Sequence, residues 1–232
     1  MPRIAAEWGV SLSVTTLRRL ARRAGYRWKR MRRSLRARRD PTLFAFFARE
    51  LALLHEAEAR GELAVVYADE CRFSRQAPVP YAWQRRGQAP VELPAERGRT
   101  GGTSVLGLWQ AKGPGQPLVS YALAGALSAA VFAAVVEDWS RTLTRPTVLV
   151  LDNASIHRAT CVQQHLHEWQ QRGLRLQFLP AYCPELNQIE RLWHRCKHYW
   201  LTPADYACEQ TLYQRVCYVL QRVGTDYSIT FA

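Results

Sequence analysis

Two strongly apolar runs, each leading into an aspartate, constrain the fold of this chain more than any other feature of its sequence. "LAVVYADE" leads into Asp69, and "PTVLVLDN" leads into Asp152. Continuous Val and Leu runs of this length are typical of buried strands in an α/β sheet. A carboxylate at the end of such a strand is costly to desolvate, so two of them need a chemical reason.

The rest of the pattern predicts a mixed α/β sheet flanked by helices. Asp40 and Pro41 form a good helix start, and the apolar spacing after them predicts a connecting helix at about 41–60. Further strands are expected in "YAWQRRGQAP", "TSVLGLWQA", "PLVSYALAG" and "LRLQFLP", and further helices at about 128–143, 158–172 and 185–200. Because strands come first and then alternate with helices, this order predicts one mixed sheet.

A third carboxylate, Glu190, lies in the first turns of the last predicted helix, inside "LPAYCPELNQIERLW". Pro180 and Pro184 stiffen the approach to this helix, and Asn187 is expected to satisfy local backbone groups. The residues expected to anchor the apolar face of the helix are Leu186, Ile189, Leu192 and Trp193. If the strands that lead into the two aspartates are neighbours, this helix brings Glu190 over both of them.

A cluster of Asp69, Asp152 and Glu190 would hold divalent cations. Oxygen ligands suit Mg²⁺, for which Mn²⁺ can substitute, and two such ions about 3.5–4 Å apart support in-line phosphoryl transfer. Each acid also has a structural interpretation: Asp152 could cap the following helix, and Glu190 could pair with Arg191 or Arg195 on its own helix. Strand alternation turns Glu70 away from Asp69, which leaves Glu70 a supporting role at most.

Positive charge is concentrated at the start of the chain. Residues 1–40 hold 13 Lys and Arg against two acids, a net of +11 out of the total of +13. Ser13 can cap a helix that stops at Gly25, and "YRWKRMRRSLRARR" after it has the pattern of a basic wing. The predicted DNA-binding residues are Arg18, Arg19, Arg22, Arg23, Arg27, Lys29, Arg30, Arg32 and Arg33.

These features predict three parts. We expect residues 1–40 to form the second half of a winged helix-turn-helix that binds double-stranded DNA, with a solvated basic tail as the alternative. Residues 41–62 would be the connecting helix and residues 63–232 the catalytic domain.

Cysteine usage and hydropathy indicate the compartment. The six cysteines form no C-x-x-C pair, and the chain opens without an apolar signal segment. We therefore expect a cytoplasmic, nucleoid-associated protein in a reducing environment, with no structural zinc. The longest apolar run, at 122–136, is too short to span a membrane, so no membrane partner is expected.

Three motifs together, "YADE", "VLVLDNASIHRA" and "LPAYCPELNQIERLWHRCKHYW", resemble the DDE transposases of bacterial insertion sequences in the mariner superfamily. The resemblance covers roughly residues 12–205 and implies a catalytic domain with a ribonuclease H-like fold. It matches Asp69, Asp152 and Glu190 to the catalytic carboxylates of the family, and 37 residues separate the last two. It also implies supporting roles for Asn153 and for His157, for which packing against a helix is an equal alternative.

Two departures from the family pattern bear on function. Gln188 stands where the family has proline, which gives the turn before Glu190 one more backbone donor. The family also carries two helix-turn-helix units before its catalytic domain, whereas this chain begins inside what resembles the second. The expectation is therefore either a mis-assigned or internal start, or a truncated copy.

Three hypotheses for the function remain. The leading one is a transposase that uses two Mg²⁺ ions to hydrolyse phosphodiester bonds at the terminal inverted repeats of an element and to transfer strands into target DNA. Under this hypothesis, the protein could form a homodimer in its complex with DNA. The second hypothesis is a ribonuclease H-like nuclease without strand transfer, and the third is a DNA-binding remnant that acts as a repressor without catalysis.

Overall fold

The computed structural model describes residues 6–7, 9–26, 36–76, 87, 101–123 and 126–231. The chain divides into two compact units, Met1–Leu35 and Arg36–Ala232. The break between the units falls inside the basic segment, and the three-part division at residues 40 and 62 stays a prediction.

In the smaller unit, a helix forms where the sequence predicts one. α2 spans Val14–Arg23, and the Ser13 hydroxyl caps it by accepting a hydrogen bond from the backbone N–H of Thr16 at 3.1 Å. The chain leaves the helix through Gly25, whose φ of +83° lies in the left-handed region that glycine tolerates. Four of the predicted DNA-binding residues are exposed on α2: Arg18, Arg19, Arg22 and Arg23. The other five lie outside the described residues, together with most of the predicted wing: Arg27, Lys29, Arg30, Arg32 and Arg33.

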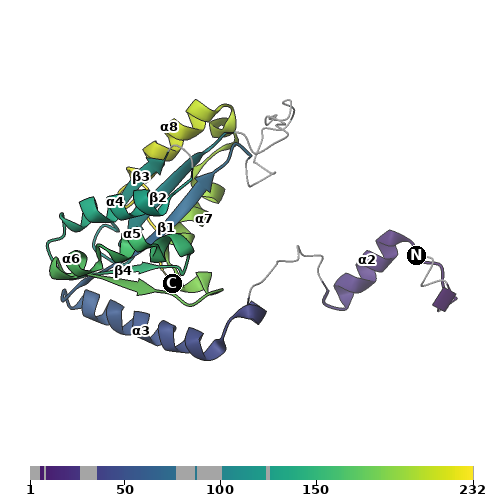
Figure 1. Cartoon of the computed structure of the whole chain (residues 1–232). Coiled ribbons are helices and arrows are strands. Elements are labelled where there is room, and N and C mark those ends of the chain that lie inside the picture. The colour runs from purple at the N-terminus through teal and green to yellow at the C-terminus, as the bar shows by residue number, and fades with distance from the viewer. Residues whose placement is uncertain are drawn as a thin grey trace. The chain divides into compact units, whose positions relative to one another are not determined.

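The larger unit is built on a five-stranded sheet with the strand order β3-β2-β1-β4-β5 (Figure 1). The strands are β1 (Ala64–Phe73), β2 (Thr103–Trp109), β3 (Leu118–Leu123), β4 (Thr147–Leu151) and β5 (Leu174–Phe178). β2 pairs antiparallel with both β1 and β3, whereas β4 pairs parallel with both β1 and β5. The predicted mixed sheet is therefore confirmed. The strand predicted at 81–90 lies outside the described residues, apart from Gly87.

Helices cover both faces of this sheet. They are α3 (Pro41–Ala59), α4 (Ala129–Ser140), α5 (Thr160–Gln163), α6 (Leu166–Gln171), α7 (Ile189–Arg195) and α8 (Glu209–Leu220). α4, α5 and α6 pack on the face that presents Val66 and Leu149. α3, α7 and α8 contribute to the core on the other face, which presents Val65 and Val148. Among the helices that the structure describes, none has the length and apolar character needed to cross a membrane.

The start of α3 follows the sequence closely. The Asp40 carboxylate accepts hydrogen bonds from the backbone N–H groups of Thr42 at 2.8 Å and Leu43 at 3.1 Å, and Pro41 occupies the first helical position. Near the other end of α3, His55 Nε2 lies 2.8 Å from the hydroxyl of Tyr67. The connecting helix is thus tied directly to β1.

The helix predicted at 158–172 is wrong as a single element. A 3₁₀ turn (Ser155–Arg158) precedes α5, and Gln164 and His165 separate α5 from α6. The N–H of His165 donates to the carbonyl of Val162 at 3.1 Å, three residues earlier. This tighter turn interrupts the α-helical ladder, which requires a partner four residues earlier.

The helix predicted at 185–200 is divided as well. Pro184–Leu186 forms a 3₁₀ turn, α7 begins only at Ile189, and Cys196–Trp200 forms a π-helical turn. Asn187 interrupts the helix with an extended backbone (φ −87°, ψ 101°), since its side chain turns to the sheet and donates from Nδ2 to the carbonyl of Ala68 at 3.3 Å. The prediction that Asn187 satisfies local backbone groups is therefore wrong, because its partner lies in β1.

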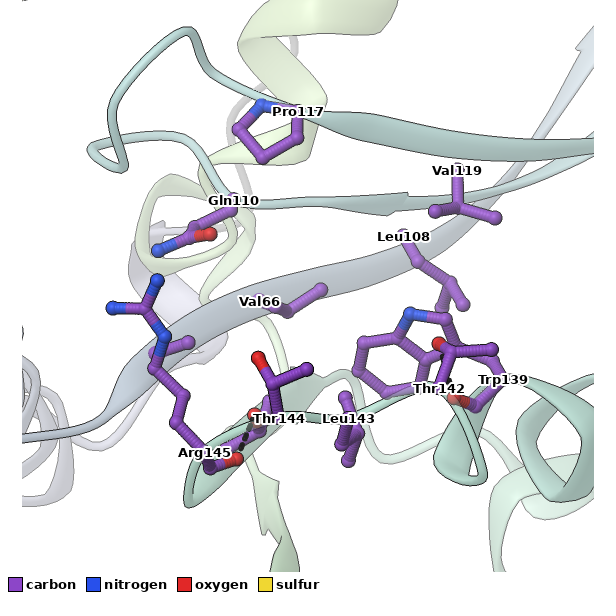
Figure 2. A pocket seen from close by; sticks show the side chains of 12 residues that line it. Val66, Leu108, Gln110, Pro117, Val119, Trp139, Thr142, Leu143, Thr144 and Arg145 are labelled. Carbon is purple, nitrogen blue, oxygen red and sulfur yellow. Dashed lines mark hydrogen bonds between the residues drawn. The ribbon is translucent and has the colours of Figure 1, made fainter.

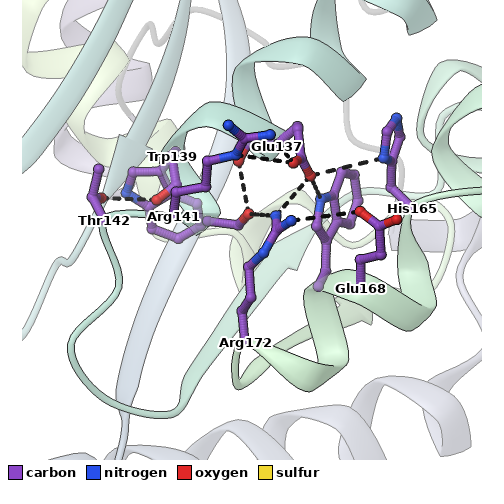
Figure 3. A network of polar contacts seen from close by, with 9 residues as sticks. Glu137, Trp139, Arg141, Thr142, His165, Glu168 and Arg172 are labelled. Atoms are coloured by element: carbon purple, nitrogen blue, oxygen red, sulfur yellow. Dashed lines mark hydrogen bonds and ion pairs between the residues drawn. The ribbon is translucent and has the colours of Figure 1, made fainter.

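A polar network joins α4 to α6 (Figure 3). The Glu137 carboxylate accepts hydrogen bonds from Arg172 at 2.8 Å, from Arg141 at 2.9 Å and from Trp169 Nε1 at 2.8 Å. These donors lower the pKa of Glu137 to about 2. His165 and Glu168 lie close enough to share a metal ion with Glu137. Because two arginines already hold the Glu137 carboxylate, we interpret the group as an ion-pair network.

Replacing Glu137 with Gln is expected to lower the midpoint of thermal unfolding near neutral pH, because both arginines lose their charged partner. A carboxyl group whose pKa falls on folding stabilises the folded state above its ordinary pKa of 4.5, and this contribution is lost as the pH falls towards 2. The melting curves of parent and variant should therefore converge in acid. Glu168→Gln is the matched control, since its carboxylate is more exposed and lies 3.5 Å from Arg172. A difference between Glu137→Gln and parent that is constant over the pH series would contradict this assignment.

A cavity of about 200 Å³ opens on the face covered by α4 (Figure 2). Ala64 and Thr147, the first residues of β1 and β4, line it together with Trp139 and Arg145. Among the described residues that line it, none is a carboxylate, histidine or cysteine. Because Ala64 and Thr147 begin their strands, the cavity lies at the opposite end of these parallel strands from Asp69 and Asp152.

Candidate functional site

The pairing of β1 with β4 brings two of the three predicted carboxylates together. The two strands are parallel neighbours, and Tyr67 is in register with Val150. Two residues further along each strand lie Asp69 and Asp152, so both continue the same register on strands about 4.8 Å apart. The sequence predicted that Asp69 ends its strand, but β1 continues past it to Phe73. Asp69 lies two residues past Tyr67, the last residue of β1 that pairs with β4, while pairing with β2 continues to Phe73.

The third carboxylate is carried by a helix on the same face of the sheet. Tyr67 and Val150, each two residues before an aspartate, belong to the core that contains Ile189 and Leu192 of α7. Because side chains alternate along a strand, Asp69 and Asp152 face α7. Glu190 lies in the first turn of α7 and is exposed. The structure thus brings Asp69, Asp152 and Glu190 to one face and one end of the sheet.

Trp193 holds the Asp69 carboxylate directly. Its indole Nε1–H donates to Asp69 Oδ2 at 3.1 Å, and the side chain is only 3% exposed. The ring fits because the residue opposite Asp69 on β2 is Gly107. A Cβ atom at Gly107 would lie 2.6 Å from Trp193 Cη2 and 3.0 Å from Ile189 Cδ1. Sequence reasoning treated Trp193 only as an apolar anchor, although a lone glycine inside the apolar strand "TSVLGLW" is a signal of close approach.

Gly107→Ala is expected to destabilise the fold by about 1–3 kcal/mol, because the new methyl group overlaps the buried indole and pushes α7 away from the sheet. Denaturant unfolding measures this change. Trp193→Leu provides the test of cause. If the overlap is responsible, the double variant should lose less stability than the sum of the two single variants. Strict additivity would show that the glycine serves another purpose.

Asp152 is oriented by the segment that follows it. Its Oδ1 atom accepts a hydrogen bond from the backbone N–H of Ala154 at 3.0 Å and lies 2.9 Å from His157 Nδ1. His157 is 4% exposed, and its ring centroid lies 4.5 Å from that of Phe132. The histidine therefore packs against α4 and also touches Asp152, so the two interpretations of this residue are compatible. Asn153 is exposed directly after Asp152.

The other supporting residues fall on different sides of the sheet. Asn187 is 5% exposed and binds the carbonyl of Ala68, the residue just before Asp69. Glu70 lies on the opposite face, where its Oε1 accepts a hydrogen bond from the backbone N–H of Leu127 at 3.3 Å. Asn187 is therefore placed to position Asp69, whereas Glu70 is directed away from the carboxylates.

The electrostatics of the cluster fit a divalent cation. Burial raises the pKa of Asp69 to about 7, and the nearby Glu190 and Asp152 add to this effect. Glu190 is exposed as a residue, but partial desolvation of its carboxylate beside the sheet raises its pKa, and the positive charge of Lys197 opposes that rise. Lys197 was missed by sequence reasoning, although it lies two helical turns after Glu190. By contrast, the hydrogen bond from His157 lowers the pKa of Asp152. The negative charges of Glu190 and Asp152 thus act on the Asp69 carboxylate, and three neighbouring carboxylates match the hard oxygen ligands that Mg²⁺ and Mn²⁺ prefer.

Comparison with protein families identifies two matching families. A family model described as "DDE superfamily endonuclease" matches residues 64–213, and one described as "Winged helix-turn helix" matches residues 3–51. The "Insertion element IS630 uncharacterized 39 kDa protein" of Shigella sonnei is 29% identical over 207 residues. The match covers 83% of this chain and 57% of that protein. This chain thus spans little more than half the length of that relative.

Several solved structures with the same fold are complexes of the Mos1 transposase. The "Mos1 transposase paired-end complex with left transposon end" has a TM-score of 0.62 and 18% identity, and covers 94% of this chain and 66% of its own chain. The "Mos1 mariner paired end complex with Mn" has a TM-score of 0.54 and 15% identity, with 98% and 75% covered. These matches confirm the ribonuclease H-like fold.

The family match extends over most of the larger unit, including all three carboxylates. The winged helix-turn-helix match covers α2 and its surroundings. This chain belongs to the DDE superfamily of endonucleases and carries a winged helix-turn-helix segment at its start.

Proposed function

We propose that this protein is a transposase of an insertion element, with Asp69, Asp152 and Glu190 as its catalytic carboxylates. The observation that carries the proposal is the convergence of these three side chains on one face of the sheet, in a chain of the DDE superfamily. Its substrates would be the terminal inverted repeats of the element and target DNA. A homodimer in the DNA complex fits the paired ends named for the Mos1 structures.

Some of these residues would bind the metal ions, and others would position the metal ligands. Asp69, Asp152 and Glu190 would hold two divalent cations, Mg²⁺ or Mn²⁺, which supply charge neutralisation and an activated water for in-line attack on a phosphodiester. Trp193 keeps the Asp69 carboxylate in place, and His157 does the same for Asp152. Glu190 rests on a helix that Ile189, Leu192 and Trp193 bury against the sheet. Rigid support matters because small errors in ligand placement are costly in rate.

The metals named for two of the Mos1 complexes agree with this donor set. One Mos1 complex contains Mn and another Mg, the latter with a TM-score of 0.53 and 16% identity. Both ions prefer oxygen ligands, and the candidate site offers three carboxylates. We therefore expect either ion to support activity.

The deciding experiment uses the intact chain with supercoiled plasmid that contains the element ends. Nicking that requires Mg²⁺ or Mn²⁺, followed by joining of the freed 3′ ends to a second DNA, is the expected result. Nicking without joining would replace the transposase with a nuclease. Binding of duplex DNA without any nicking would leave a DNA-binding repressor.

A further inference from the structure

An exposed aromatic side chain lies in the loop that leads from the sheet to the helix carrying Glu190, and its backbone conformation is strained. Tyr182 lies in the loop between β5 and the 3₁₀ turn that leads to α7, and its φ is +60°. Only a few per cent of residues other than glycine adopt positive φ, and for a bulky residue this conformation is an outlier. Such strain persists only where the surroundings impose it, and it concentrates at functional sites.

Both ends of the loop are fixed, which explains how the strain is maintained. Leu179 and Cys183 are each 3% exposed, and the N–H of Leu179 donates to the carbonyl of Leu151 at 2.8 Å. Since Asp152 follows Leu151, the loop starts directly beside the second aspartate. Tyr182, between these anchors, is 46% exposed. A loop that starts beside Asp152 therefore holds an aromatic ring in solvent, where the ring adds nothing to the buried core.

One arginine borders this ring, and two more lie at the ends of the loop. Arg38 Cζ lies 5.8 Å from the centroid of the Tyr182 ring. Arg39 lies 3.6 Å from Glu185, just after the loop, and Arg158 Cζ lies 5.4 Å from the ring centroid of Phe178, just before it. An exposed ring beside a guanidinium group suits a nucleotide, because the ring stacks on a base while the cation meets a phosphate.

We propose that Tyr182, with Arg38 beside it, is a stacking platform for an unpaired base of the DNA strand whose phosphodiester lies at the carboxylates. The base must be unpaired, since a base inside a duplex has both faces covered by its neighbours. This inference rests on the proposed function and adds a contact that selects DNA with an opened end. Tyr182 acts here by positioning the strand.

The test uses the full chain in metal-free buffer with a duplex that carries 2-aminopurine in a one-nucleotide overhang. Stacking quenches the fluorescence of this base, and anisotropy of a distant label reports binding separately. Parent and Tyr182→Phe should quench. Tyr182→Ala and Tyr182→Gly should not quench, and their affinity for the overhang duplex should fall about tenfold, within the range for loss of one stacked base. Their affinity for a blunt duplex should stay unchanged.

Two variants test whether the loss of quenching is due to the Tyr182 ring itself. One excludes an effect of unfolding, and the other excludes contact with any exposed tyrosine. Tyr182→Gly relieves the positive φ, so it should melt no earlier than the parent while still losing the quenching. Tyr218→Ala removes another exposed tyrosine, 41% exposed with Arg222 Cζ 3.7 Å from its ring centroid, and should behave as the parent.

The possible failures are distinct. Quenching by Tyr182→Ala equal to that of the parent, or an equal loss on blunt DNA, would overturn the platform and leave the proposed function standing. Absence of DNA binding by the parent would overturn both.

Discussion

Asp152→Asn should eliminate metal-dependent nicking of supercoiled DNA while leaving duplex affinity unchanged or slightly higher. The substitution keeps the side-chain shape, and the amide oxygen can still accept the hydrogen bond from the backbone N–H of Ala154. It removes the negative charge that recruits a divalent cation, and it also removes a charge that repels phosphate. Asp69→Asn and Glu190→Gln should behave alike, because each takes one carboxylate from the same cluster.

Glu70→Gln is the matched control for this experiment. Glu70 follows Asp69 in the chain, but it accepts a hydrogen bond from Leu127 on the other face of the sheet. Its loss should therefore change nicking little. Calorimetric titration with Mn²⁺ gives a second readout, in which the three cluster variants should bind the ion weakly and Glu70→Gln should bind it as the parent does. Parent-like nicking by Asp152→Asn, or equal damage by Glu70→Gln, would show that the carboxylate assignment is wrong.

The second large effect concerns DNA affinity. Residues 1–35 carry ten Lys and Arg against Glu7, a net of +9 out of +13. A chain that begins at Arg36 should lose duplex affinity by orders of magnitude, because cation–phosphate contacts supply most non-specific binding. In the intact chain, a variant with glutamine at four arginines of α2 should bind more weakly and show a shallower salt dependence. The four are Arg18, Arg19, Arg22 and Arg23.

The salt dependence makes the second prediction quantitative. The slope of log K against log salt should fall by about 0.9 for each phosphate contact that is lost. Lys112→Gln with Arg175→Gln, which removes two exposed charges from the larger unit, is the control and should leave most of the slope in place. All of these variants should bind Mn²⁺ as the parent does, since the carboxylates are untouched. Salt-independent binding, or an equal effect of the control pair, would contradict a role for α2 in phosphate contact.

Much of the fold could be predicted because its signals are local. Ser13 and Asp40 cap their helices through backbone groups two or three residues away, so the sequence alone reveals both starts. The apolar runs before Asp69 and Asp152 predict buried strands for the same reason. The helix predicted at 185–200 failed for a different reason. Asn187 divides it to bind a carbonyl 119 residues away, and no local pattern reports such a partner.

The sequence by itself determined the identity and order of the carboxylates, the strands that lead into the two aspartates, and the separation of a basic start from a nearly neutral remainder. Only the tertiary structure decided how the carboxylates are held. The hydrogen bond from Trp193 to Asp69 spans 124 residues, and it forms because Gly107, on a third segment, leaves room for the indole. Periodicity shows which side chains are buried, since burial depends on neighbours along one element. It does not show which buried side chains meet, since that depends on the register of strands and helices that are distant in the chain.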